Sequence, residues 1–109
     1  MLKITNKLVR DNIPDIISRK GGRAKIKILE DKEYQKELIK KLKEETKEFE
    51  EDNNKEELAD IYEVFIAILE TADTNIEEIS HIAEIKRKKN GAFKNRIYME
   101  YYDDGSCLR

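Results

Sequence analysis

The chain has 109 residues and a net charge of −2, with 42% charged and 39% apolar residues. This length suits one domain, and the slightly acidic charge argues against a nucleic-acid-binding protein. No apolar run approaches the roughly 18 residues of a membrane span, and the first residues lack the apolar core of a signal peptide. A lone cysteine, Cys107, excludes a disulfide framework and suits a reducing compartment. We expect a single cytoplasmic domain, residues 1–109, that binds neither nucleic acid nor membrane.

The first third of the chain predicts a short helix and then a short strand. Pro14 follows two residues that can cap a helix, and proline is tolerated in a first turn. A short helix over residues 13–20, closed by Gly21-Gly22, fits this pattern. Residues 25–29 alternate isoleucine with lysine, which is typical of a strand.

Three further helices are predicted. Apolar residues recur at helical spacing from about Asp31 to about Asp52, where Asn53-Asn54 break the pattern. A second long helix runs from about Lys55 to Ala72. A third starts at the capping-box sequence of residues 74–77 and ends near Asn90-Gly91.

The tail FKNRIYMEYY alternates apolar and polar residues again, so we expect it to pair with residues 25–29. The predicted fold class is therefore all-α. It is a helical bundle of two long antiparallel helices plus a third, with a short N-terminal helix and a minor two-stranded sheet.

Four acidic residues form two pairs at a spacing of three, Glu45 with Glu48 and Glu57 with Asp60. At about 100° per residue, Glu45 falls inside the apolar stripe of its helix and Glu48 at the edge of that stripe. Glu57 and Asp60 lie on a side of the next helix that continues into apolar residues. Residues three apart are neighbours on a helix, and antiparallel helices would bring the two pairs face to face.

Carboxylates at partly covered positions point to a metal site. Two unit charges about 4 Å apart repel by roughly 4 kcal/mol at an effective dielectric near 20, so such groups protonate, move apart or collect cations. Oxygen-only ligands suit Mg²⁺, with Mn²⁺ as a substitute. The alternative is an ordinary acidic surface, since the chain has 24 Asp and Glu residues.

The sequences Glu45-Thr-Lys-Glu48 and Glu57-Leu-Ala-Asp60 match an E-x-x-E … E-x-x-D signature. This signature resembles that of the all-α nucleoside triphosphate pyrophosphohydrolases, which include the MazG-like and phosphoribosyl-ATP pyrophosphohydrolase-like proteins. The segments NKLVRDNIPDII, EELADIYEV and KKNGAFKNRI resemble, in the same order, those of the house-cleaning branch of this superfamily.

The resemblance implies that Glu45, Glu48, Glu57 and Asp60 bind Mg²⁺. It also implies that a nucleoside triphosphate is hydrolysed to monophosphate and pyrophosphate, clearing unwanted nucleotides from the pool. One of the acids, Glu48 or Glu45, would be catalytic by activating the attacking water. The sequence leaves open which acid this is, how many metal ions bind, and which base or sugar is preferred.

Four basic residues are candidates for the substrate phosphates: Lys7, Arg10, Lys88 and Arg96. Arg96 matches a basic position of the family, whereas Ala92 stands where MazG-like enzymes tend to carry a basic residue. For Lys7 and Arg10, the alternative is that they form salt bridges to the acidic helices and hold the N-terminus. For Lys88, the alternative is an ordinary surface position at a helix end, where cations are favoured.

The second long helix is apolar on more sides than a small bundle can cover, so we expect a homodimer or a higher homo-oligomer. Tyr62 is interpreted as part of the core on this helix rather than as a residue that stacks on a base. Two alternative functions stay open. One is phosphoribosyl-ATP hydrolysis, against which the opening segment NKLVRDN argues, and the other is a non-catalytic helical binding module.

Overall fold

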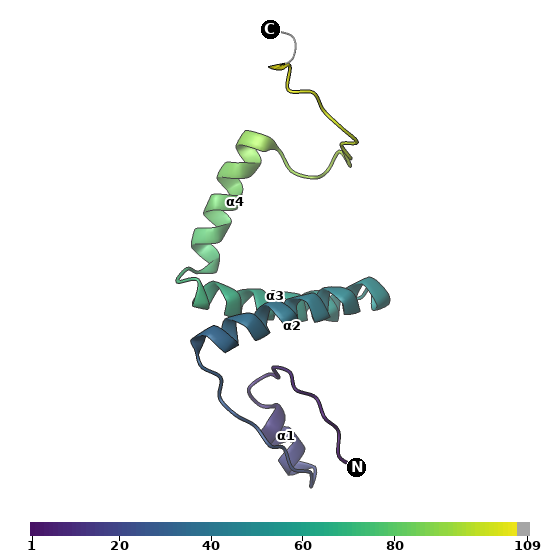
Figure 1. Ribbon diagram of the computed structural model, residues 1–109, viewed down its shortest axis with the longest axis vertical. Coiled ribbons are helices and arrows are strands. Elements are labelled where there is room, and N and C mark those ends of the chain that lie inside the picture. The colour runs from purple at the N-terminus through teal and green to yellow at the C-terminus, as the bar shows by residue number, and fades with distance from the viewer. Residues whose placement is uncertain (107–109) are drawn as a thin grey trace. The chain divides into compact units, whose positions relative to one another are not determined.

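The computed structural model describes residues 1–106, so Cys107 lies outside the described residues. The chain divides into two compact units, Met1–Ile76 and Glu77–Arg109, each of which is described by itself. The described residues contain four helices, as predicted: α1 (Ile13–Arg19), α2 (Asp31–Asp52), α3 (Lys55–Thr71) and α4 (Ile76–Asn90) (Figure 1). The all-α fold class is confirmed, while the organisation as a single domain stays a prediction.

The short helix α1 ends at Arg19, and two glycines follow its C-cap residue, Lys20. Gly21 has a φ of +88°, which a residue with a Cβ rarely adopts. The backbone N–H of Gly22 donates to the carbonyl oxygen of Ile17 at 2.9 Å, and a Cβ on Gly22 would approach Ile17 Cγ2 to 2.8 Å. The pair therefore stops α1 and returns the chain towards α2.

Helices α2 and α3 form an antiparallel hairpin, lying side by side with only two residues between them (Figure 1). Asn53 ends α2 in the left-handed conformation, with a φ of 58°, and its N–H donates to the Phe49 carbonyl oxygen at 2.8 Å. Asn54 then caps α3, because its side-chain oxygen accepts a hydrogen bond from the backbone N–H of Glu57 at 3.0 Å. The short turn fixes the alignment of the two helices.

The core of the described chain is thin. Leu38 of α2 and Leu69 of α3, which are 4% and 5% exposed, are the two buried apolar side chains within residues 1–106. Leu38 lies fifteen residues before Asn53, and Leu69 lies fifteen residues after Asn54. In an antiparallel hairpin, equal spacing from the turn places both leucines at the same level along the helices.

The apolar face of α3 is covered unevenly. Leu69 is buried, but Leu58 and Tyr62 near the start of the helix are 48% and 53% exposed. Residues four apart lie on the same side of a helix, so these two side chains form one exposed apolar patch. The prediction that Tyr62 belongs to the core is therefore wrong for this chain.

The predicted two-stranded sheet is absent, and no strand occurs anywhere between residues 1 and 106. The alternating segments, residues 25–29 and 97–102, belong to different units, and their isoleucines and tyrosines are exposed. Two short strands without a third strand or a covering helix are marginally stable in water. Alternation alone was therefore too weak a signal for this sheet.

The second unit consists of nearly all of α4 and the segment that follows it. Arg87, Lys88 and Lys89 lie in the last turn of α4, where cations oppose the negative end of the helix dipole. Gly91, with a φ of +88°, follows the helix end. None of the helices in the described part of the chain has the length and apolar character needed to cross a membrane.

Candidate metal centre

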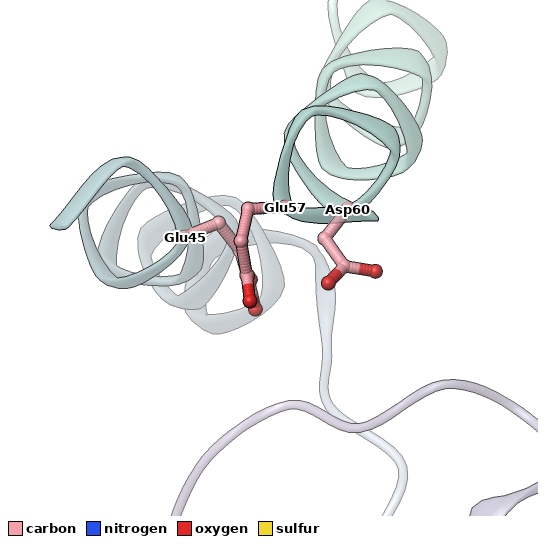
Figure 2. Close-up of side chains that lie close together, drawn as sticks. All are labelled: Glu45, Glu57 and Asp60. Carbon is pink, nitrogen blue, oxygen red and sulfur yellow. The ribbon is translucent and has the colours of Figure 1, made fainter. Parts of the chain in front are cut away.

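Three carboxylates from adjacent helices converge at one place. Glu45 comes from α2, and Glu57 and Asp60 come from α3; one oxygen of each lies within 4.8 Å of the others. Figure 2 shows the three side chains on the same side of the hairpin, with the carboxylates of Glu45 and Glu57 close to each other and that of Asp60 beside them. We call these three residues the carboxylate cluster.

The local structure of the hairpin accounts for this convergence. Glu57 and Asp60 are three residues apart and share one side of α3. The cap from Asn54 holds the backbone of Glu57, and the positive end of the helix dipole favours acids in this first turn. The two-residue turn then places the C-terminal half of α2, which carries Glu45, against α3.

Among the described residues, Glu45 is the one charged residue that is buried, with 7% of its surface exposed. Burial raises its pKa, and the nearby charge of Glu48 raises it further. Lys41 opposes this shift, with its Nζ 3.4 Å from Glu45 Oε1, but it does not cancel it. Burial and the neighbouring negative charge thus outweigh the one lysine beside this carboxylate, and its pKa stays above the ordinary range.

Glu57 has an unsatisfied acceptor. Its Oε2 atom is buried and has no hydrogen-bond partner among the described residues, although the residue as a whole is only half-buried. Desolvation raises the pKa of Glu57, the charges of Glu48, Asp52 and Asp60 raise it further, and a side-chain interaction with Glu48 adds to the shift. A buried acceptor without a donor is costly, and a cation would satisfy it.

The fourth predicted ligand, Glu48, lies outside the carboxylate cluster. It is half-buried on α2, and its charge contributes to the raised pKa of both Glu45 and Glu57. The structure therefore brings three of the four predicted ligands together and places Glu48 near them as a further negative charge.

Two basic residues of the N-terminal segment, residues 1–12, pair with acids of the hairpin. Arg10 Nη2 lies 2.7 Å from Asp60 Oδ1, and Lys7 Nζ lies 3.0 Å from Glu44 Oε1. These are the salt bridges that the sequence left as the alternative for Lys7 and Arg10. A role of either residue at substrate phosphates stays a prediction.

Two further residues lie at this place, Lys41 and Glu44, and neither was predicted from the sequence. Lys41 Nζ lies 3.4 Å from carboxylate oxygens of both Glu44 and Glu45, and Lys7 contacts Glu44 from the other side. The spacings of three and four from Lys41 were the available signal, since such pairs meet on a helix surface. Lys7, Lys41 and Glu44 also line part of a hollow of about 220 Å³ beside the N-terminal segment.

The other two predicted phosphate ligands belong to the second unit. Lys88 Nζ lies 3.1 Å from Glu84 Oε1, one turn earlier on α4. Arg96 has a φ of 59°, and its backbone N–H donates to the Phe93 carbonyl oxygen at 3.4 Å. Their assignment to phosphate binding therefore stays a prediction.

No family model, no curated protein and no solved structure matches this chain. The resemblance to the all-α nucleoside triphosphate pyrophosphohydrolases therefore rests on the sequence segments that suggested it. The geometry of the carboxylate cluster is an observation separate from that resemblance.

Proposed function

We propose that the protein is a Mg²⁺-dependent nucleoside triphosphate pyrophosphohydrolase that releases a nucleoside monophosphate and pyrophosphate. The observation that carries the proposal is the convergence of Glu45, Glu57 and Asp60 from two helices to within 4.8 Å. Like charges this close repel one another, and a bound cation would offset that repulsion. The resemblance of the acid signature and its flanking segments to this superfamily supplies the reaction.

The residues present suit a hard divalent cation. The cluster offers only carboxylate oxygens, which Mg²⁺ and Mn²⁺ prefer. The buried Oε2 of Glu57 has no hydrogen-bond partner among the described residues, and Glu45 is a buried carboxyl whose pKa is raised by burial and by the charge of Glu48. A cation held by Glu45, Glu57 and Asp60 would correct both deficits.

Bound at this place, Mg²⁺ would neutralise phosphate charge and help to orient the attacking water. Glu48 is the candidate general base, because it lies outside the cluster but near enough to raise the pKa of two of its members. It would take a proton from the water as the bond between the α- and β-phosphates breaks. Glu45 holds the cation in this scheme, and Lys7, Arg10, Lys88 and Arg96 are the candidates for phosphate contact.

Product analysis on a panel of triphosphates in Mg²⁺ tests the reaction. The expected products are monophosphate and pyrophosphate; release of diphosphate and orthophosphate would place the protein in another class. Glu57→Gln keeps the shape of the side chain but removes a ligand, so it should abolish turnover. The matched control is Glu56→Gln, an adjacent exposed acid of the same helix turn, which should leave turnover unchanged. Including phosphoribosyl-ATP in the panel separates the alternative within the superfamily.

The non-catalytic binding module is favoured by one observation. Two of the three cluster acids already have a cationic partner, Lys41 for Glu45 and Arg10 for Asp60. If the cluster acids serve only in these ion pairs and bind no metal, millimolar Mg²⁺ should not raise the melting temperature of the free protein. A metal site should raise it, as ligand linkage requires.

We also propose that the chain forms a homodimer or a higher homo-oligomer through α3. The exposed patch of Leu58 and Tyr62 supports this assembly, because large apolar side chains on one helix face gain free energy when covered. Light scattering at micromolar concentration should give at least twice the chain mass of 12.9 kDa. Leu58→Lys should shift the protein towards the monomer, and a monomeric wild type would contradict the proposal.

A further inference from the structure

Asp60 differs from the other two cluster acids because a side chain from a distant part of the sequence holds it. Arg10 Nη2 lies 2.7 Å from Asp60 Oδ1, and the two residues are fifty positions apart. A guanidinium–carboxylate hydrogen bond of this length is charge-assisted and stronger than a neutral one. In the view of Figure 2, part of the N-terminal segment, drawn as a pale purple tube, runs below the three carboxylates.

A second ion pair fastens the same segment to the hairpin. Lys7 Nζ lies 3.0 Å from Glu44 Oε1, one residue before the cluster member Glu45. Lys7 thus contacts α2 and Arg10 contacts α3, so the segment spans both helices at the edge of the cluster. Only the Arg10 pair uses a cluster carboxylate.

We propose that Arg10 and the divalent cation compete for Asp60, so that metal binding requires Arg10 to leave this carboxylate. The inference rests on the proposed function, in which the cluster binds Mg²⁺. A guanidinium within hydrogen-bond distance of a metal ligand withdraws negative charge from that ligand and repels the incoming cation. If the cation used the other oxygen of Asp60, the repulsion would still act, because the carboxylate charge is shared by both oxygens.

The competition reconciles the two roles that the sequence left open for Arg10. Before the cation binds, Arg10 is a salt-bridge partner that holds the N-terminal segment on the hairpin. Once the cation takes Asp60, the guanidinium becomes free beside the metal, where its planar fork suits a phosphate. Lys7 has no such exchange, because Glu44 lies outside the cluster.

A titration of the full chain with Mn²⁺ alone, followed by the electron paramagnetic resonance signal of the free ion, tests the competition. Arg10→Gln removes the competitor and is expected to tighten Mn²⁺ binding about three- to tenfold, the range set by a partly exposed ion pair and one nearby charge. Lys7→Gln removes the same charge from the same segment without touching a cluster acid. It is expected to change the affinity by about twofold or less.

Each outcome decides between the two proposals. The competition is supported if Arg10→Gln binds Mn²⁺ more tightly than the wild type and Lys7→Gln does not. It is also supported if Arg10→Gln binds Mn²⁺ and the wild type does not. If the wild type binds Mn²⁺ and Arg10→Gln binds it equally or more weakly, the competition is overturned while the metal site stands. Equal tightening by both variants also overturns it, because the effect is then one of general charge. If no protein in the series binds Mn²⁺, the proposed function fails together with this inference.

A measurement on the unsubstituted chain guards against a folding defect in the variant. In ¹⁵N NMR, the side-chain Nε–H signal of Arg10 should move towards the position of a free arginine when Mg²⁺ is added to saturation. The signal of Arg19, which pairs with Asp15 at 3.0 Å on α1, is the internal control and should not move. An unmoved Arg10 signal at saturating Mg²⁺ would overturn the competition.

Discussion

Two consecutive glutamates of α2 meet opposite surroundings. Glu44 lies between Lys7 at 3.0 Å and Lys41 at 3.4 Å, in what we call the paired site. Partial burial acts to raise the pKa of Glu44, but these two lysines outweigh it and the pKa is lowered. Glu45 shares Lys41 but is buried near Glu48 and Asp60, and its pKa is raised. At the paired site the fold supplies enough cations for its acid, whereas at the carboxylate cluster it gathers more acids than cations.

This difference shows that composition alone does not separate a candidate metal site from an ordinary acidic surface. Both glutamates belong to the same charged run, and a count of acids treats them alike. The informative feature is the imbalance of charge at a buried position, since an unbalanced carboxylate is costly unless a ligand compensates it. Substitutions at the two sites should therefore have different effects.

The largest effect is expected from a core substitution that destabilises the hairpin, and with it both sites. Leu38→Ala deletes one of the two buried leucines that hold α2 against α3 and should lower the free energy of unfolding by about 2–4 kcal/mol. Because both sites depend on the hairpin, the response to Mg²⁺ should weaken as well. Urea unfolding followed by circular dichroism measures the change. The control is Ile39→Ala, which alters the next, exposed residue and should cost much less; equal losses would mean that Leu38 is no core residue.

The next effect separates the two sites by function. Under the proposed function, Glu45→Gln should reduce hydrolysis by about 100-fold or more and remove the expected rise in melting temperature with Mg²⁺, since the cation would lose a buried ligand. Glu44→Gln should keep both properties within a few-fold, because Glu44 is not in the carboxylate cluster. A pyrophosphate assay and thermal melting with and without Mg²⁺ provide the measurements. Equal losses in the two variants would remove the distinction between the sites.

Without metal, the same two substitutions should change the free energy of unfolding by smaller amounts and in opposite directions. Glu45→Gln should stabilise the protein in EDTA by about 1 kcal/mol, because it removes a buried charge from an acidic environment. Glu44→Gln should destabilise it by about 0.5 kcal/mol, because two partly exposed ion pairs are lost. Urea midpoints in EDTA measure both changes. Loss of stability in Glu45→Gln would show that Lys41 already balances this carboxylate.

The smallest effect is the pH dependence of these two differences. A carboxyl with a raised folded pKa destabilises the fold once the pH rises above about 4.3, the ordinary pKa of Glu. The gain in stability from Glu45→Gln should therefore appear above this pH and be absent below it. A carboxyl whose folded pKa is lowered stabilises the fold above that pH, and this contribution is lost as pH falls through the folded pKa. The deficit of Glu44→Gln should therefore vanish in acid.

Unfolding series in EDTA from about pH 3.5 to 7 measure both curves, with Glu63→Gln, an exposed acid of α3, as the control. Two curves that bend in the same direction would contradict the opposite pKa shifts of these neighbours.

The sequence predicted the helices well because their signals are local. Apolar spacing and the Asn53-Asn54 break define α2 and α3, and α2 has the bounds that were predicted. The same periodicity placed Glu45, Glu57 and Asp60 on facing sides. It could not show that Glu48 lies outside the cluster, because that depends on side-chain directions in the packed hairpin.

The remaining errors concern contacts between distant segments. The pair Arg10–Asp60 joins residues fifty positions apart, and no pattern within one helix indicates which acid an arginine meets. The predicted sheet needed two remote segments to meet, and alternation in each of them carried no information on that meeting. Tyr62 fitted an apolar face by spacing, but α2 covers only part of that face.

The turn at Asn53-Asn54 has a consequence for how the length of this chain can vary. Asn53 occupies the left-handed position that ends α2, and Asn54 already caps α3, so the connection contains no spare residue. An added or deleted residue here would have to be absorbed by the last turn of α2 or by the first turn of α3, which carries Glu57. Insertions between residues 20 and 30, in the connection from α1 to α2, would not move any of the three carboxylates along their helices. The tolerance of the chain to changes in length should therefore be lowest at its shortest loop.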